Sequence, residues 1–230
     1  MPSHHRPPDL QEAVANLAQR YPASPVLTDP LQLILWENVG YLIDDQRRAA
    51  LFVEFGTRVG FDPRQIQEAD SAVLLDIASR GGMNPPMRVG RWRDIAEITL
   101  ARAAGDLDRT LRALPPAKAR TLLKAYPTIG DPGSDKILLF AGIAVRPSLD
   151  SNGVRALARL GYFIEQKAYG PSYTAAIAAL TRHGVLERDW LIMAYVALRE
   201  HGKALCKRSN PLCMACPLDA ECAHAVVLTL

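Results

Sequence analysis

Four cysteines are the residues of this 230-residue chain whose type and spacing most clearly indicate chemistry. They fall in one window of 17 residues, as Cys206-x6-Cys213-x2-Cys216-x5-Cys222, and the preceding 205 residues contain none. In a reducing compartment, four thiols this close more often hold a metal than form disulfides. They suit a tetrahedral zinc ion or a four-iron cluster with one cysteine per iron. The first gap is longer than those of ordinary zinc knuckles, which favours a [4Fe-4S] cluster over zinc.

The elements that position these cysteines are expected to be helices. Apolar residues recur at helical spacing along almost the whole chain, without convincing alternation of strand type, so the fold class is all-α. Helices are expected from Leu10 after the cap Asp9, and from Pro30 after Asp29 to about Ile43. The further expected helices are 45–58, 70–79, 87–104, 107–113, 116–125, 134–144, 151–160, 171–182 and 187–202.

Composition excludes some classes of protein. Hydrophobic residues make up 49% and charged residues 22%, as in soluble globular proteins. The longest apolar run, Ile137 to Val145, is far short of the roughly 18 residues of a membrane-spanning helix. The segment Met1 to Leu10 has no apolar stretch and does not resemble a secretory signal, so we expect a cytoplasmic protein without a membrane partner. The net charge is +3, too small to indicate nucleic-acid binding by itself.

The distribution of charge is more informative than its sum. Residues 88–124 contain nine basic and four acidic side chains, a local excess of 9 − 4 = +5. Such a segment can contact phosphates or form a solvated helix surface. In the cysteine loop, Lys207 and Arg208 lie in the long first gap, where they could also reach a phosphate.

Two further segments, taken with the cysteine loop, resemble a known family. A glycine-bearing turn joins two expected helices, and Asp150 follows its first proline, Pro127, by 23 positions. The segments read Tyr126-Pro127-Thr128-Ile129-Gly130-Asp131-Pro132-Gly133-Ser134 and Leu149-Asp150-Ser151-Asn152-Gly153-Val154-Arg155. With the C-x6-C-x2-C-x5-C loop they resemble the endonuclease III and MutY group of helix-hairpin-helix DNA glycosylases. The cysteine loop also resembles that of the plant Demeter-type glycosylases.

The resemblance extends from about Pro30 to Cys222 and implies two lobes, with DNA held across the cleft between them. One is a six-helix domain, 30–149, with the helix-hairpin-helix at about 116–145. The other is an iron–sulfur cluster domain formed by 1–29 and 150–230.

The resemblance also implies DNA contacts. In the hairpin, backbone N–H groups at a helix start would bind a phosphate, and this assigns Gly130, Gly133, Ser134 and Lys136 to the DNA. The family pattern is L-P-G-V-G-x-K-T-A, so Thr128 replaces a glycine here and Asp131 adds a negative charge. Met83 falls where endonuclease III inserts an apolar wedge beside the extruded nucleotide, although a core methionine is an equally good account.

For catalysis, the resemblance implies that Asp150 stabilises a sugar cation and positions water with Asn152. Glu37 falls where MutY-type enzymes carry the glutamate that protonates a departing purine. Its neighbours one turn away are apolar or small, so partial desolvation would favour its protonated form, whereas a structurally paired glutamate is the alternative. The lyase lysine of endonuclease III should lie at Pro132, and Lys136 comes four residues later. Absence of that amine favours hydrolysis by water.

The sequence therefore predicts a monomeric, monofunctional DNA glycosylase of base excision repair, located in the cytoplasm at the nucleoid. It would flip a damaged or mispaired base from double-stranded DNA and hydrolyse the N-glycosidic bond. A bifunctional glycosylase/AP lyase that uses Lys136 and a non-catalytic DNA-binding protein of the same fold are the alternatives. The sequence does not choose between a purine and a mismatched thymine or uracil as the substrate.

Overall fold

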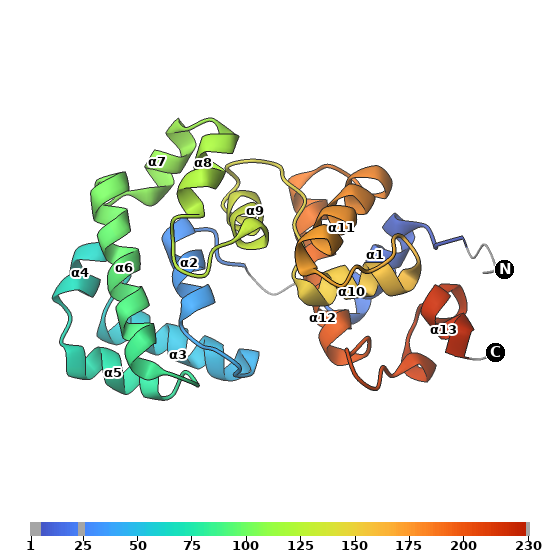
Figure 1. The fold of residues 1–230 in the computed structure, drawn as a ribbon, viewed down its shortest axis with the longest axis horizontal. Helices are drawn as coiled ribbons and strands as arrows, with labels where there is room; N and C mark the ends of the chain where they lie inside the picture. The colour runs from blue at the N-terminus through green and yellow to red at the C-terminus, as the bar shows by residue number, and fades with distance from the viewer. Residues whose placement is uncertain (1–5, 23–25, 229–230) are drawn as a thin grey trace. The chain divides into compact units, whose positions relative to one another are not determined.

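The computed structural model describes residues 6–22 and 26–228, and the chain divides into two compact units (Figure 1). The terminal unit consists of residues 1–26 and 145–230, and the central unit of residues 27–144. Part of the N-terminal segment considered as a secretory signal, residues 1–5, lies outside the described residues.

The all-α fold class is confirmed for the described residues, whose only strand-like feature is the isolated bridge between Tyr41 and Gly82. The central unit contains α2 (Pro30–Asn38), α3 (Asp45–Arg58), α4 (Pro63–Glu68), α5 (Ser71–Ser79), α6 (Pro85–Ala103), α7 (Leu107–Ala113), α8 (Pro116–Leu123) and α9 (Asp131–Phe140). The terminal unit contains α1 (Leu10–Arg20), α10 (Ser151–Leu160), α11 (Tyr169–His183), α12 (Arg188–Ala204), the 3₁₀ turns η1 (Cys213–Ala215) and η2 (Asp219–Glu221), and α13 (Ala223–Leu228). None of the described helices could cross a membrane.

Aspartate caps start most of these helices. In seven of them an aspartate side chain accepts backbone N–H groups of the first turn, which satisfies donors that have no partner inside the helix. The caps are Asp9, Asp29, Asp44, Asp62, Asp70, Asp106 and Asp150. Because this signal is local, the helix starts agree well with the sequence prediction.

The end of α2 differs from the prediction. The helix stops at Asn38, before the expected end at Ile43, because the chain turns away to meet another loop. Tyr41 N donates to Gly81 O at 2.9 Å, and Leu42 has a φ of 56°, a left-handed conformation that no helix interior accommodates. The short helices α4 and α13, of six residues each, were not predicted.

Each unit has its own core. In the central unit, α6 packs against α4 and α5 and buries Trp92 completely, with the ring of Phe55 at 4.9 Å between centroids (Figure 1). In the terminal unit, α12 packs against α1 and α10. Gly202 of α12 allows this packing, since a Cβ there would lie 2.7 Å from the backbone oxygen of Asn152. The close contact of α12 with α10 brings the start of α10 beside the segment that leads to the cysteines.

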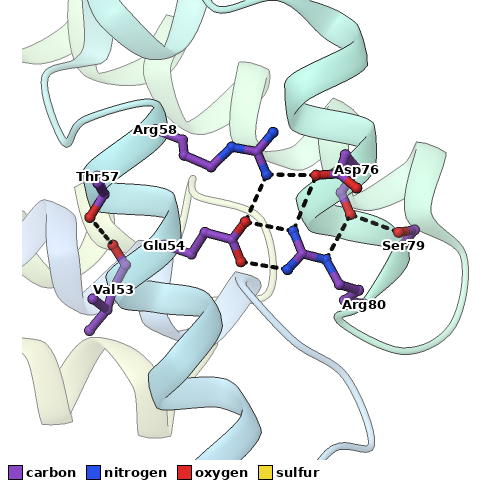
Figure 2. Close-up of polar contacts among 7 residues, drawn as sticks. All are labelled: Val53, Glu54, Thr57, Arg58, Asp76, Ser79 and Arg80. Atoms are coloured by element: carbon purple, nitrogen blue, oxygen red, sulfur yellow. Dashed lines mark hydrogen bonds and ion pairs between the residues drawn. The ribbon is translucent and has the colours of Figure 1, made fainter.

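A network of four charged side chains joins α3 to α5 on the surface of the central unit. Figure 2 shows the guanidinium groups of Arg58 and Arg80 directed at the carboxylates of Glu54 and Asp76. Arg80 contacts both oxygens of Glu54 at 2.6 Å, and Arg58 contacts one at 2.7 Å. The hydrogen bonds from Arg80 and then Arg58 lower the pKa of Glu54 from its usual 4.5 to about 2.

We expect Glu54→Gln to lower the urea unfolding midpoint modestly at neutral pH, because both arginines lose an ionised partner. A carboxyl group with a lowered pKa stabilises the fold above its unfolded value and loses that effect as it becomes protonated. The difference between variant and wild type should therefore shrink as the pH falls from about 4.5 towards 2. Glu12→Gln, at an exposed glutamate of α1, is the control. An unchanged difference across that range would contradict the prediction.

Candidate functional site

Asp150 is held rigidly at the N-terminus of α10. Its Oδ1 accepts from the backbone N–H groups of Asn152 at 3.0 Å and Gly153 at 2.8 Å. Its Oδ2 accepts from the side-chain amide of Asn152 at 2.8 Å. These donors and the helix dipole all stabilise a negative charge, and the side chain is 22% exposed. Asp150 is thus a carboxylate of fixed orientation that solvent can reach.

Asn152 links Asp150 to a buried arginine. The Asn152 side-chain oxygen accepts from Arg155 Nη2 at 2.9 Å, and Arg155 also donates to the backbone oxygens of Gly202 at 2.7 Å and Cys206 at 2.9 Å. Arg155 is buried, and burial lowers its pKa. A continuous chain of hydrogen bonds therefore runs from Asp150 to the backbone of the first cysteine.

Two residues near Asp150 were not foreseen from the sequence. Arg199 of α12 places its Nε 3.7 Å from Asp150 Oδ2. Partial desolvation, followed by the negative charge of Asp150, raises the pKa of Tyr169, a residue that is 44% exposed, to about 12. No local pattern marks either residue, because both reach Asp150 through the packing of α11 and α12 on α10.

The four cysteines line one cavity of the terminal unit, together with Arg159 and His201. Arg159 Nη1 donates to Cys206 Sγ at 3.4 Å, and its guanidinium also binds the backbone oxygens of Lys207 and Arg208. The side chains of Lys207 and Arg208 are exposed, as a phosphate contact requires. His201 Nε2 lies 3.8 Å from Cys216 Sγ, and burial lowers the pKa of this histidine to about 4.

The cysteine site is compatible with a bound metal group. Burial raises the pKa of Cys216 to about 11 and also raises that of Cys222, so a bound cationic group is needed to hold these sulfurs as thiolates. Among the described residues, no three His, Cys, Asp or Glu side chains are grouped closely enough to hold one metal ion. A cluster places each cysteine on a different iron, whereas zinc needs all four sulfurs about 2.3 Å from one atom. The donor set and its arrangement are compatible with a [4Fe-4S] cluster.

In the central unit, α8, the turn after it and α9 form the hairpin. Thr128 has a φ of 65°, so it adopts the left-handed conformation in which the family pattern has a glycine. Its hydroxyl donates to Asn38 Oδ1 at 3.2 Å. Asn38 is buried, and its amide donates to Pro127 O at 3.2 Å and to Ile34 O at 2.9 Å. Contacts with α2 thus hold the turn in place of the missing glycine.

The first turn of α9 has no side-chain cap, in contrast to the aspartate-capped helices. Gly130 is its N-cap residue, Gly133 lies within its first turn, and Ser134 is buried with its hydroxyl donating to Asp131 O at 2.9 Å. Lys124 contacts Asp131 at 2.6 Å and Arg120 contacts it at 3.0 Å. The hydrogen bond from Lys124, together with the charge of Arg120, lowers the pKa of Asp131. The negative charge that departs from the family pattern is therefore neutralised within the hairpin.

Glu37 and Lys136 form an ion pair between α2 and α9, with Lys136 Nζ 2.7 Å from Glu37 Oε1. The lysine side chain is only 12% exposed and the glutamate side chain 32%. Lys136 Nζ also lies 5.6 Å from the centroid of the Phe140 ring. The helical neighbours of Glu37 suggested wholly apolar surroundings. The structure differs, because the hairpin places the cation Lys136 beside Glu37.

Comparison with known proteins supports the fold. No family model and no curated protein sequence matches the chain. Solved structures do match: an endonuclease III–DNA covalent intermediate in an estranged-adenine complex has a TM-score of 0.75 at 15% identity, covering 96% of this chain and 97% of that one. A thermostable thymine-DNA glycosylase has a TM-score of 0.74 at 12% identity, over 94% and 95% of the chains. A non-covalent endonuclease III–DNA complex has a TM-score of 0.74 at 16% identity, over 96% of each.

The chain has the helix-hairpin-helix DNA glycosylase fold. This confirms the fold expected from the hairpin, Asp150 and the cysteine loop.

Most of the basic excess in residues 88–124 is used inside this fold. Five of its nine basic side chains donate to backbone oxygens or to acidic groups, so they are not available as the free phosphate-binding surface considered from the sequence. They are Arg88, Arg93, Arg112, Arg120 and Lys124. The four charges of Arg120, Lys124, Asp131 and Asp135 also sum to zero, with Asp135 bound by Arg120 at 2.7 Å.

Met83 lies in an exposed loop of the helix-hairpin-helix fold, with 65% of its side chain accessible, so a core role is excluded. Leu42, on the loop joined to it through Tyr41 and Gly81, is 76% exposed. Buried Arg88 anchors the Met83 loop by donating to Met83 O at 2.9 Å. Two apolar side chains are thus presented on adjoining loops.

We expect Asn38→Ala to destabilise the hairpin turn by about 2 kcal/mol, because it leaves the part-buried Pro127 carbonyl and the Thr128 hydroxyl without this partner. Hydrogen exchange should show faster opening at the amides of Ile129 and Ser134. Asn16→Ala, at an exposed position of α1, is the matched control and should change little. Equal exchange rates in the two variants would show that Asn38 does not hold the turn.

Proposed function

We propose that this chain is a monomeric, monofunctional DNA glycosylase that removes a damaged or mispaired base from double-stranded DNA. The observation that carries the proposal is Asp150, a carboxylate fixed by two backbone N–H groups and Asn152. It occurs in a fold whose solved examples include endonuclease III bound to DNA and a thymine-DNA glycosylase. Base excision repair at the nucleoid follows as the setting of this activity.

Asp150 would act on the sugar of the flipped nucleotide. Cleavage of an N-glycosidic bond develops positive charge on the deoxyribose, as in glycoside hydrolysis generally. A carboxylate that is already ionised and oriented stabilises this charge without reorganisation. Asn152 keeps Oδ2 of Asp150 oriented and helps to position water, while Arg155 fixes the Asn152 amide. Glu37 would contact the base.

The DNA contacts would come from several segments. The N–H groups at Gly130 and Gly133, where the helix has no side-chain cap, suit a phosphate, and exposed Lys207 and Arg208 add positive charge. The expected contact from Ser134 is not supported, because its N–H donates to Gly130 O at 2.9 Å and the residue is buried. Exposed Met83 would fill the gap left by the extruded nucleotide. When bound, a [4Fe-4S] cluster would supply iron–thiolate bonds that close the 206–222 loop around Lys207 and Arg208.

Lys136 supports hydrolysis rather than the lyase reaction. A lysine needs a free amine to attack a sugar carbon, and the Lys136 nitrogen is already engaged by the Glu37 carboxylate at 2.7 Å. Pro132 occupies the position expected for the lyase lysine and carries no amine. The enzyme would therefore activate water and leave an abasic site.

We expect Asp150→Asn to reduce the single-turnover rate of base release at least ~100-fold while binding to the same duplex is retained, because the stabilising charge is lost. Duplexes that each contain one defined lesion or mismatch provide the assay, with alkali used to reveal abasic sites. The control is Asp189→Asn, at an exposed aspartate of α12. Full activity of Asp150→Asn would refute the assignment of the site.

The same assay separates the alternative functions. Borohydride should trap no covalent enzyme–DNA adduct, and strands should break only after alkali, because there is no amine nucleophile. A trapped adduct that disappears in Lys136→Ala would indicate a bifunctional lyase. Binding without any product would indicate a non-catalytic protein.

We expect anaerobically purified protein to be brown, with broad absorbance near ~400 nm and about four irons per chain, because four cysteines serve one cluster. Metal analysis and the visible spectrum check this. Serine at any one of Cys206, Cys213, Cys216 or Cys222 should reduce both signals. Colourless protein with one zinc per chain would contradict the cluster.

A further inference from the structure

The ion pair between Glu37 and Lys136 bears on which base the site can release. The Lys136 side chain is only 12% exposed, and the Glu37 side chain is 32% exposed. In such surroundings two opposite charges at 2.7 Å stabilise each other more strongly than at an open surface. Breaking a partly buried ion pair is costly, so the pair persists. Glu37 is therefore held as a carboxylate, which accepts hydrogen bonds and has no proton to donate.

This state of Glu37 is poorly suited to a purine. Adenine has basic ring nitrogens, and its acid-assisted release needs a proton on one of them before the bond to the sugar breaks. An ionised Glu37 cannot supply that proton, and an ammonium group is a weak acid for such a nitrogen because its pKa is ordinarily near ~10. The proton-donor role expected of Glu37 from the sequence thus conflicts with its partner.

Release of uracil or thymine does not need a proton from Glu37. Neither has a basic ring nitrogen, and each can leave as an anion whose charge is spread over N1 and the two carbonyl oxygens. Their N3–H group is a donor flanked by those carbonyl acceptors. A carboxylate beside an ammonium is complementary to the N3–H group and its flanking carbonyls. The carboxylate accepts a hydrogen bond from N3–H, and the ammonium donates one to a carbonyl oxygen.

We propose that the Glu37–Lys136 pair selects a pyrimidine of the uracil or thymine type; this inference rests on the glycosylase function proposed above. The C1′–N1 bond breaks and its electron pair stays on N1. The oxygen of a water molecule bonds to C1′, and the proton lost by that water ends on the released base. Lys136 keeps Glu37 ionised and itself donates to a carbonyl oxygen of the base.

The test compares single-turnover release of uracil and thymine opposite guanine with release of adenine opposite guanine or 8-oxoguanine. We expect wild-type protein to release a pyrimidine at least ~10-fold faster than adenine. Lys136→Met should lower the ratio of pyrimidine to adenine rates at least ~10-fold, because Glu37 can then be protonated. Lys136→Arg should keep the ratio. Lys167→Met, at an exposed lysine of the terminal unit, is the control.

A ratio separates this role from a purely structural one, since partial misfolding lowers both rates together. Glu37→Gln gives a second measurement that does not depend on Lys136, and it should keep uracil release within ~10-fold because an amide oxygen still accepts from N3–H. A loss of ~100-fold or more would indicate a proton donor and overturn the inference. Faster release of adenine by wild-type protein, or an unchanged ratio in Lys136→Met, would also overturn it while the glycosylase proposal stands. Release of neither class would overturn both proposals.

Discussion

The geometry of the terminal unit depends on Arg155, a buried cation whose guanidinium is surrounded by oxygen acceptors. It joins the first turn of α10, the end of α12 and the start of the cysteine loop, through Asn152, Gly202 and Cys206. A buried arginine without these acceptors would carry a large desolvation penalty, so the three segments are constrained to meet around it. The absence of a side chain at Gly202 makes the approach sterically possible. This arrangement fixes the orientation of Asp150 through Asn152.

Compensation of charge between helices also organises the central unit. Asp131 and Asp135 bind the basic residues of α8, and Glu37 binds Lys136 across α2 and α9. Charges that a count along the chain assigns to a DNA-binding surface are thereby used to join helices. Lys207 and Arg208 are among the cationic groups left exposed.

The sequence was most informative where structure depends on neighbouring residues. Asp9, Asp29 and Asp150 predicted helix starts because a cap acts within three residues of its own position. The spacing of the cysteines likewise identified a loop that closes on itself, and with the hairpin it led to the fold. The roles of Glu37, Met83 and the DNA-contacting residues stay predictions.

What the sequence could not indicate are contacts between distant positions. Lys136 and Glu37 are 99 positions apart, and the approach of Arg199 to Asp150 depends on the packing of α12 on α10. Helical periodicity also could not place the end of α2, because a hydrogen bond from Tyr41 to Gly81 and the left-handed backbone of Leu42 override it. Thr128 is a similar case, since a contact with Asn38 supports a conformation that its own residue type disfavours.

The contact between the Tyr41 and Gly82 loops affects the free energy with which Leu42 and Met83 can bind another molecule. Gly82 has a φ of 96°, and a Cβ there would lie 2.1 Å from Tyr41 O, so the two loops fit together only with glycine at this position. Asn84 is also left-handed, and Arg88 anchors the Met83 carbonyl. The backbone beneath these exposed side chains is thus ordered when the protein folds. Association then restricts mainly side-chain rotamers, so preorganisation leaves more of the contact energy available as affinity.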